Sequence, residues 1–292
     1  MSNTKRILDI ETLHSDPLID IIKILNGAIH ELTMVIKENE ISIATSNESK
    51  SIYIKLIFKA SEFNKFYTKY ERLELGINLD HLNTHISSMA NSSVLSLYIN
   101  ENDKQTLCIE GYNSKENSIT KSELKLMELN YQEKKRKKLN VSVYVLMKSS
   151  IFYNICKEMK SISDYVDIKC TTNKLIFSCK GDSGKKERTC TEKEGGISIE
   201  WEEVPYKLVH GIYELKNIIL FDKCVKLSKQ VLILMNNDDD ILSIKHVIAN
   251  LGEMIIVFAP YDEDKITNNY NYSDDEDEIL LNENLEDDDD ES

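Results

Sequence analysis

The sequence is short of the residues that interrupt regular structure, with nine glycines and three prolines among 292 residues. Short alternating or continuous apolar runs recur between clusters of Asn, Asp, Ser and Lys, a pattern typical of strands linked by polar turns. Apolar residues make up 41% of the chain, which is enough for one large or two medium cores. We therefore expect a globular chain in which strands outnumber helices.

Long hydrophobic runs are also missing. No segment approaches the roughly 20 apolar residues of a membrane helix, and residues 1–6 do not place a basic head before an apolar stretch. The six cysteines are scattered, with no C-x-x-C pair and no Cys/His cluster. We expect neither export nor membrane insertion, and we expect reduced thiols in an intracellular compartment.

Catalytic motifs are absent as well. The chain has no phosphate-binding G-x-x-x-x-G-K-[ST] loop and no G-x-S-x-G nucleophile turn. His81 and His85 have the spacing of two metal ligands on a helix, but no acid completes an H-E-x-x-H motif and no further ligand is visible. We therefore expect no enzyme, no catalytic residue, no metal and no cofactor. Residues 238–240, three consecutive aspartates, are expected to form a hairpin turn.

The net charge of -14 is concentrated at one end of the chain. Residues 262–292 hold 15 acids and one lysine, so the remaining body has 35 acids and 35 bases. We expect a disordered acidic tail over 262–292, in which Ile279, Leu280, Leu281 and Leu285 offer a short recognition motif. A neutral body can still gather lysines on one surface, so the net charge does not exclude DNA binding.

A unit of amphipathic helix, strand, polar turn and second strand occurs four times. Its helices are expected to start near positions 17, 79, 149 and 212, so the third begins 132 residues after the first and the fourth 133 after the second. Each unit exposes an apolar helix face that it cannot bury alone, and paired units would let two helices cover one side of a sheet. The sequence therefore predicts a duplicated α+β fold, with two similar domains joined between residues 118 and 140.

The individual elements follow from apolar periodicity. The first helix is expected from Leu18, Ile21, Ile22, Leu25 and Ile29, with Pro17 in its first turn. Strands are expected at 32–36, 41–44, 52–58, 73–76, 94–99, 106–109, 141–147, 165–170, 175–179, 197–201, 231–235 and 241–247.

Four local sequences resemble the eukaryotic and archaeal PCNA family. They are G-I-N-L at 76–79, E-L-K-L-M-E-L at 123–129, F-Y-N-I-C-K at 152–157 with its following hairpin, and F-A-P at 258–260. The resemblance extends over residues 18–260 and implies the DNA clamp fold, a ring-forming arrangement of two duplicated domains that each hold two helix-plus-sheet units. It divides the chain into an N-terminal clamp domain (1–119), an interdomain connector (120–140), a C-terminal clamp domain (141–261) and the acidic tail (262–292).

The same resemblance implies a function and partners. A member of this family is expected to form a closed homotrimer around double-stranded DNA, without sequence specificity, and to act as a processivity factor without catalysis. A DNA polymerase and a clamp loader are the implied protein partners. The implied location is the nucleus or a viral replication compartment, and the abundance of Asn, Ile, Lys and Asp suggests an AT-rich genome such as that of a large DNA virus or a protist.

A sliding ring needs phosphate contacts that are weak and independent of sequence, because hydrogen bonds to base edges would hold it at one site. The residues expected to make these contacts are Lys157, Lys160, Lys216 and Lys223. Thr84 and Ser87 stand where family members have lysines, so we expect uneven contact with DNA around the ring.

Partner docking is expected beneath the connector, on an apolar wall formed by Ile241, Val257, Phe258, Ala259 and Pro260. Residues 134–136 (K-K-R) replace the usual apolar, glycine, apolar triplet, and Ser46 replaces a methionine. This basic rim favours acidic or less hydrophobic client peptides. The basic run 134–138 also fits a solvated loop, a nuclear-import signal or a contact to the DNA backbone.

Alternatives remain open because Ser122 replaces an aromatic residue at the subunit edge, where residues 185–191 would supply the partner strand. One alternative is a subunit of a heteromeric checkpoint-like clamp or a monomeric viral processivity factor. The other is an acidic-tailed interaction scaffold that does not encircle DNA.

Overall fold

The computed structural model describes residues 5–13, 15–128, 136–192, 196–204, 207–236, 240–261 and 278–281, of which 136–139 and 278–281 are described as backbone. The predicted aspartate turn falls mostly at 237–239, outside this range. No helix within the described ranges is long and apolar enough to cross a membrane.

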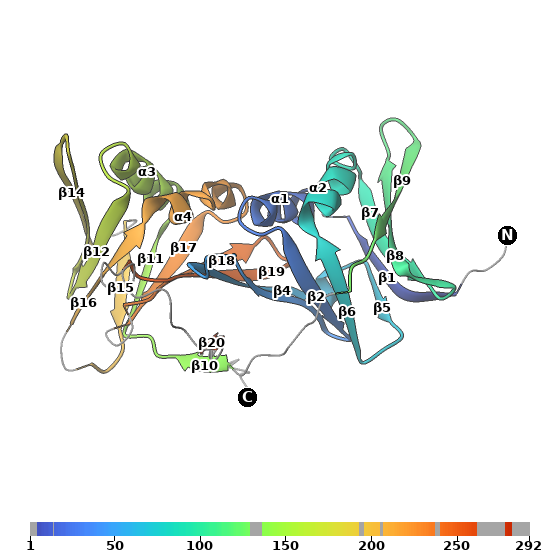
Figure 1. Ribbon diagram of the computed structural model, residues 1–292, viewed down its shortest axis with the longest axis horizontal. Coiled ribbons are helices and arrows are strands. Elements are labelled where there is room, and N and C mark those ends of the chain that lie inside the picture. The colour runs from blue at the N-terminus through green and yellow to red at the C-terminus, as the bar shows by residue number, and fades with distance from the viewer. Residues whose placement is uncertain are drawn as a thin grey trace, which may run out of the picture.

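Helices of both halves lie in one row on one side of the molecule (Figure 1). They are α1 (Ser15–Asn26), α2 (Leu79–Ser87), α3 (Ser149–Lys160) and α4 (Leu215–Ile219), the last followed by the 3-10 turn η2 (Asp222–Lys226). The sequence explains their starts: Pro17 suits the first turn of α1, and the Asn78 side chain accepts a hydrogen bond from the His81 backbone N–H at 2.9 Å to cap α2. Contacts join α1 to α2, α3 to α4, and α1 to η2 across the middle.

A nine-stranded antiparallel sheet runs through both halves beneath the helices. In spatial order its strands are β15 (Ser198–Trp201), β11 (Val143–Lys148), β17 (Gln230–Met235), β18 (Leu242–Ile248), β19 (Gly252–Phe258), β4 (Ile52–Lys59), β3 (Glu40–Ser46), β2 (Glu31–Lys37) and β6 (Arg72–Asn78). The 3-10 turn η1 (Ala60–Glu62) follows β4.

Two smaller sheets close the ends of the molecule. One contains β5 (Lys65–Thr68), β1 (Arg6–Thr12), β7 (Val94–Asn100), β8 (Asp103–Asn113) and β9 (Ser118–Lys125), and the other contains β14 (Gly184–Thr191), β13 (Lys174–Gly181), β12 (Tyr165–Thr171) and β16 (Leu208–Glu214). The β8–β9 and β13–β14 hairpins project beyond the helices at opposite ends, so the helices line the hollow of an arc (Figure 1).

The two halves meet where β19 pairs with β4. This antiparallel pairing runs from Gly252 opposite Phe58 to Phe258 opposite Ile52. The Asn217 side chain also donates a hydrogen bond to the Ser51 hydroxyl across the junction, at 3.2 Å. The halves therefore share one sheet instead of being joined by the connector alone.

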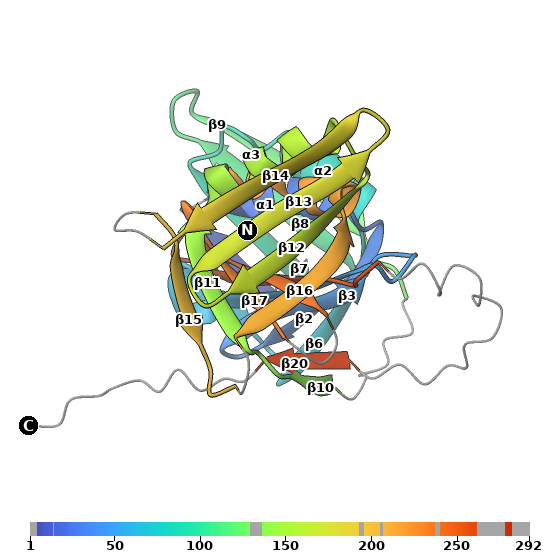
Figure 2. The same ribbon diagram turned by 90° about the vertical axis from the view of Figure 1, so that its left-hand side faces the viewer.

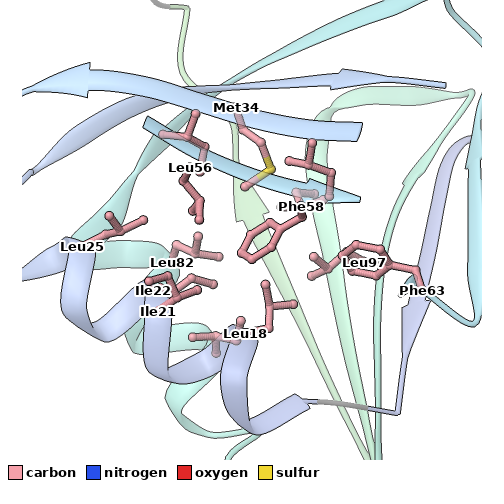
Figure 3. A pocket seen from close by; sticks show the side chains of 14 residues that line it. Leu18, Ile21, Ile22, Leu25, Met34, Leu56, Phe58, Phe63, Leu82 and Leu97 are labelled. Carbon is pink, nitrogen blue, oxygen red and sulfur yellow. The ribbon is translucent and has the colours of Figure 1, made fainter. Parts of the chain in front are cut away.

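The core lies between the helices and the sheets, and its composition differs between the halves. The C-terminal half contains aromatic contacts, such as Phe152 with Phe177 at a centroid distance of 6.1 Å. The N-terminal half has its own aromatic contacts, of Phe63 with Phe58 and Phe66, among mainly aliphatic residues. It leaves a cavity of about 20 Å³ between α1, α2 and the sheet (Figure 3). Only apolar side chains such as Leu18, Leu82 and Phe58 line it. The cavity offers no polar group to a ligand, so we assign it to packing.

The α+β fold with its four repeated units is confirmed, with two differences in detail. The fourth helix begins at Leu215 rather than near 212, because residues 208–214 continue as strand β16 against β12. Apolar periodicity also did not predict the strands β1, β5, β9, β10, β14, β16, β19 and β20.

One of these strands departs from the prediction of a disordered tail. Residues Glu278–Leu281 form β20, which pairs in parallel with β10 (Arg136–Leu139) of the connector. Both views place this two-stranded sheet on the side of the central sheet opposite the helices (Figures 1 and 2). The four residues combine one acid with three aliphatic residues, so they differ in composition from the rest of the tail.

A buried imidazole lies in the C-terminal core. His246 on β18 is 0% exposed and stacks on Tyr153, whose hydroxyl lies 2.9 Å from its Nε2. Its Nδ1 has no hydrogen-bond partner among the described residues. Burial lowers the pKa of His246 from 6.5 to about 4, because no charged partner compensates the desolvated imidazolium.

The free energy of unfolding should therefore fall as the pH drops from 6.5 to about 4. The unfolded chain takes up a proton near the ordinary pKa whereas the folded chain does not, so about 3 kcal/mol is present above this window and lost through it. Urea unfolding of His246→Gln should show a flatter pH dependence than the unsubstituted chain. The control His210→Gln removes an imidazole whose side chain is 61% exposed and should leave the dependence unchanged. Equal slopes for all three proteins would contradict this assignment.

Candidate nucleic-acid interface and docking surface

We call the exposed surface of the four helices and η2 the inner face. All the lysines predicted to contact DNA lie on its C-terminal half: Lys157 and Lys160 on α3, Lys216 on α4, and Lys223 on η2. We refer to these four as the inner lysines. Lys226, at the end of η2, is also exposed and was not predicted, although its spacing of three from Lys223 was a usable signal.

Charge on the inner face is unevenly distributed. The C-terminal helices and η2 hold five lysines against Glu158 and Asp222, a formal charge of +3. The N-terminal helices hold one lysine, Lys23, against three aspartates, a formal charge of -2. The cationic surface therefore covers α3, α4 and η2, and uneven contact with DNA stays a prediction.

Three of the inner lysines are paired with carboxylates of the same chain. Lys157 lies 2.5 Å from Asp222, and Lys216 lies 3.1 Å from Glu214. Lys160 is hydrogen-bonded to Asp164, and this hydrogen bond and its charge lower the pKa of that carboxyl. The fourth, Lys223, makes no ion pair with any residue that the structure describes.

These pairs are partly exposed, so solvent screens them and a competing anion can replace the carboxylate. Holding a lysine in such a pair also fixes its direction over the inner face. The arrangement favours weak, exchangeable binding of a polyanion over high-affinity binding.

The predicted docking wall is only partly accessible. Phe258 is 1% exposed and packs on Phe221 with ring centroids 6.0 Å apart, and Val257 is 6% exposed. Ala259 is exposed, whereas Pro260 and Ile241 are half-buried. The surface that a partner could contact is therefore formed by Ala259, Pro260 and Ile241, with Phe258 supporting it from the core.

Backbone contacts hold this segment against both halves. The Ala259 N–H donates to the Ser51 carbonyl at 3.1 Å, and the Tyr261 N–H donates to the Ile212 carbonyl at 2.7 Å. The Tyr261 ring lies 4.0 Å from that of Tyr165, and the hydrogen bond between them raises the pKa of Tyr165 to about 12. Residues 259–261 are thus presented in a set position.

Each end of the arc carries a strand with one unpaired edge, β9 at one end and β14 at the other. On β9, Ser122 is half-buried and hydrogen-bonded to His85 of α2, while Ile119 is 57% exposed. On β14, Lys186 and Arg188 approach Glu158 of α3 at 2.9 and 3.9 Å. Ser122 therefore supports β9 against its own helix instead of supplying an apolar contact at the edge.

Among the described residues, the cysteines and the possible metal ligands are not gathered into a site. In the described part of the chain no three His, Cys, Asp or Glu side chains converge as metal ligands. All six cysteines are free, and five of them are buried. Burial raises the pKa of the Cys170 thiol to about 12 and raises those of Cys156 and Cys224 still further, so these thiols stay protonated.

Two duplicated α+β halves that share a sheet, with helices lining one face and a free strand edge at each end, define the DNA clamp fold. Models of the two domains of proliferating cell nuclear antigen match this chain, the N-terminal domain at residues 11–135 and the C-terminal domain at 137–261. The chain belongs to the proliferating cell nuclear antigen family.

A curated relative agrees with this assignment. A protein of Acanthamoeba polyphaga mimivirus described as "Probable DNA polymerase sliding clamp" is 28% identical over 227 residues. The match covers 76% of this chain and 47% of the relative, so the chain spans about half the length of the protein that it matches.

Proposed function

We propose that this chain is a DNA polymerase processivity factor, a sliding clamp that encircles double-stranded DNA without catalysis. The observation that carries the proposal is the single row of helices, cationic over α3, α4 and η2, in the hollow of an arc with a free strand edge at each end. The domain division into 1–119, 120–140 and 141–261 is part of the proposal, and the two family matches, which meet near residue 136, support it.

Ring closure would use the two free edges. β9 and β14 are both eight residues long, and an edge of unpaired backbone groups is a template for pairing with another strand. Pairing β9 of one copy with β14 of the next is a head-to-tail contact, which closes into a ring when the rotation per subunit allows it. A homotrimer is the proposed assembly.

DNA would be held by enclosure rather than by affinity. The inner lysines can exchange their carboxylate partners for phosphates, which gives contacts that do not depend on base sequence. The negative N-terminal half of the inner face would make few such contacts. Around a homotrimer, the surface that faces the duplex would then alternate between a cationic half and an anionic half of each subunit, which favours movement along the duplex.

Protein partners would dock on the side of the central sheet that faces away from the helices. Ala259, Pro260 and Ile241 offer the accessible part of the wall, supported by Val257 and Phe258. A DNA polymerase and other replication and repair proteins are the proposed clients, and an ATP-driven loader would open the ring. The proposed site of action is the nucleus or a viral replication compartment, and the mimivirus relative supports the second.

A second candidate is a clamp that does not form a homotrimer, either monomeric or part of a heteromeric ring. Its support is the charge at the two edges: β9 carries two lysines and one glutamate, and β14 carries three bases and one glutamate. Like charges that meet across a strand pair are destabilising. An acidic-tailed scaffold that does not encircle DNA would not be retained on DNA by topology.

Retention on DNA of controlled topology tests encirclement. The protein is threaded onto linear duplex DNA from its ends, the ends are then blocked with a bulky protein, and the sample is washed in salt high enough to remove phosphate contacts. We expect retention only on the DNA with blocked ends. Equal loss from blocked and open DNA would exclude a closed ring.

Neutralising the inner lysines tests their contact with phosphate. With all four changed to Gln, the slope of log affinity against log salt should become shallower by about 0.9 for each phosphate that the variant no longer neutralises. The matched control changes four exposed lysines of strands and turns away from the inner face: Lys59, Lys69, Lys104 and Lys174. Fluorescence titrations over a salt series measure the affinity of both variants for DNA. An equal reduction of the slope in both variants would show that the inner lysines do not contact phosphate.

A charge placed on the β9 edge tests the subunit contact. Ile119→Glu should shift the assembly toward monomer, because the substitution adds an acid to an apolar position that pairing would cover. Val247→Glu is the control, since Val247 on β18 is 55% exposed and Ile119 is 57% exposed. Light scattering coupled to size exclusion reports the mass. A trimer that survives Ile119→Glu would exclude the β9 edge as the subunit contact, and a monomer without any substitution would favour the second candidate.

A further inference from the structure

The described part of the acidic tail, the strand β20, pairs with a strand of the connector. The strand β20 lies beside β10 of the connector in parallel register, with Arg136 opposite Glu278, Lys137 opposite Ile279, Lys138 opposite Leu280 and Leu139 opposite Leu281. The connector contributes three bases to this pair, and the tail contributes one acid followed by three aliphatic residues.

Strand addition of this kind is a general mode of peptide recognition, in which backbone hydrogen bonds supply affinity and side-chain pattern supplies selectivity. The register places a base opposite an acid at one end and leucine opposite leucine at the other. Residues 262–292, with 15 acids and one lysine, also complement the basic run at 134–138 in charge. Both the local pattern and the overall charge therefore favour the tail as an occupant of the connector.

The segment between Tyr261 and Glu278 is long enough to allow this contact. Sixteen residues separate Tyr261, where the C-terminal segment is held against β16, from Glu278 at the start of β20. Such a linker reaches roughly 55 Å when extended. Because β10 and β20 belong to one chain, their pairing is intramolecular and needs no second molecule to supply either strand.

We infer that β20 is a resident ligand of the connector, and that proteins which use β10 must displace it. The site would accept an extended peptide with an acidic residue followed by aliphatic residues. In this arrangement the tail competes in cis with such peptides and lowers their apparent affinity in proportion to its occupancy. The competition with clients rests on the proposed function, whereas the occupancy of the connector by β20 does not.

A peptide added in trans tests the inference on the full chain. The probe is a labelled synthetic peptide of residues 274–285, and the variant carries Ile279→Pro with Leu281→Pro, since proline cannot donate to a strand ladder. Fluorescence anisotropy should show the probe binding this variant about ten-fold more tightly than the unsubstituted chain, as expected when the tail occupies the site about nine-tenths of the time. Leu285→Pro, outside β20, is the matched control and should bind the probe as weakly as the unsubstituted chain.

Engineered cysteines provide a second measurement that does not depend on the probe. Neighbouring strand positions lie within the distance that a disulfide spans, so Lys137→Cys with Ile279→Cys should cross-link under mild oxidation. The pair Lys137→Cys with Leu285→Cys should cross-link several-fold less. Equal cross-linking of the two pairs, or equal probe affinity for the double-proline variant and Leu285→Pro, would overturn the inference.

The two hypotheses fail separately. Loss of retention on DNA with blocked ends, combined with the expected probe binding, would reject the clamp while keeping β20 as the ligand of the connector. Retention on that DNA, combined with unchanged probe binding, would reject the resident ligand alone.

Discussion

The pairing of β19 with β4 is the contact on which the rest of the structure depends. It joins sheets from two duplicated halves into one, with Ile256 and Ile54 opposite each other and both 0% exposed. Because successive side chains of a strand point to opposite faces, a shift of one residue would turn these apolar residues away from the helices. The buried face therefore sets the register, and the register sets how the helices of one half align with those of the other.

That alignment creates the inner face. Neither half has more than two of the helices, and contact between α1 and η2 continues the row across the junction. Since the helices bury their apolar sides against one continuous sheet, their polar sides all face the same hollow. The inner face arises from this shared orientation, although no single helix provides it.

The inner face and the strand pair of β10 and β20 lie on opposite sides of the central sheet (Figures 1 and 2). The inner lysines lie on the helix side, while β10 and β20 lie on the opposite side (Figures 1 and 2). A net charge of -14 is compatible with a cationic inner face because 15 acids lie in residues 262–292, outside the four helices and η2 in the sequence. The partly exposed ion pairs of Lys157 and Lys216 offset part of the positive charge of the inner face.

The sequence by itself determined the repeated helix and strand units, their duplication and the presence of lysines on the solvent side of α3, α4 and η2, because apolar periodicity reports which side of an element is buried. Only the tertiary structure decided what each buried side packs against. The pairing of Lys157 with Asp222, the burial of Phe258 on Phe221 and the hydrogen bond between Ser122 and His85 all join residues far apart in the chain. The tail strand is the clearest case, since four residues in an acidic segment have no apolar periodicity and become a strand only where the connector supplies a backbone edge to pair with.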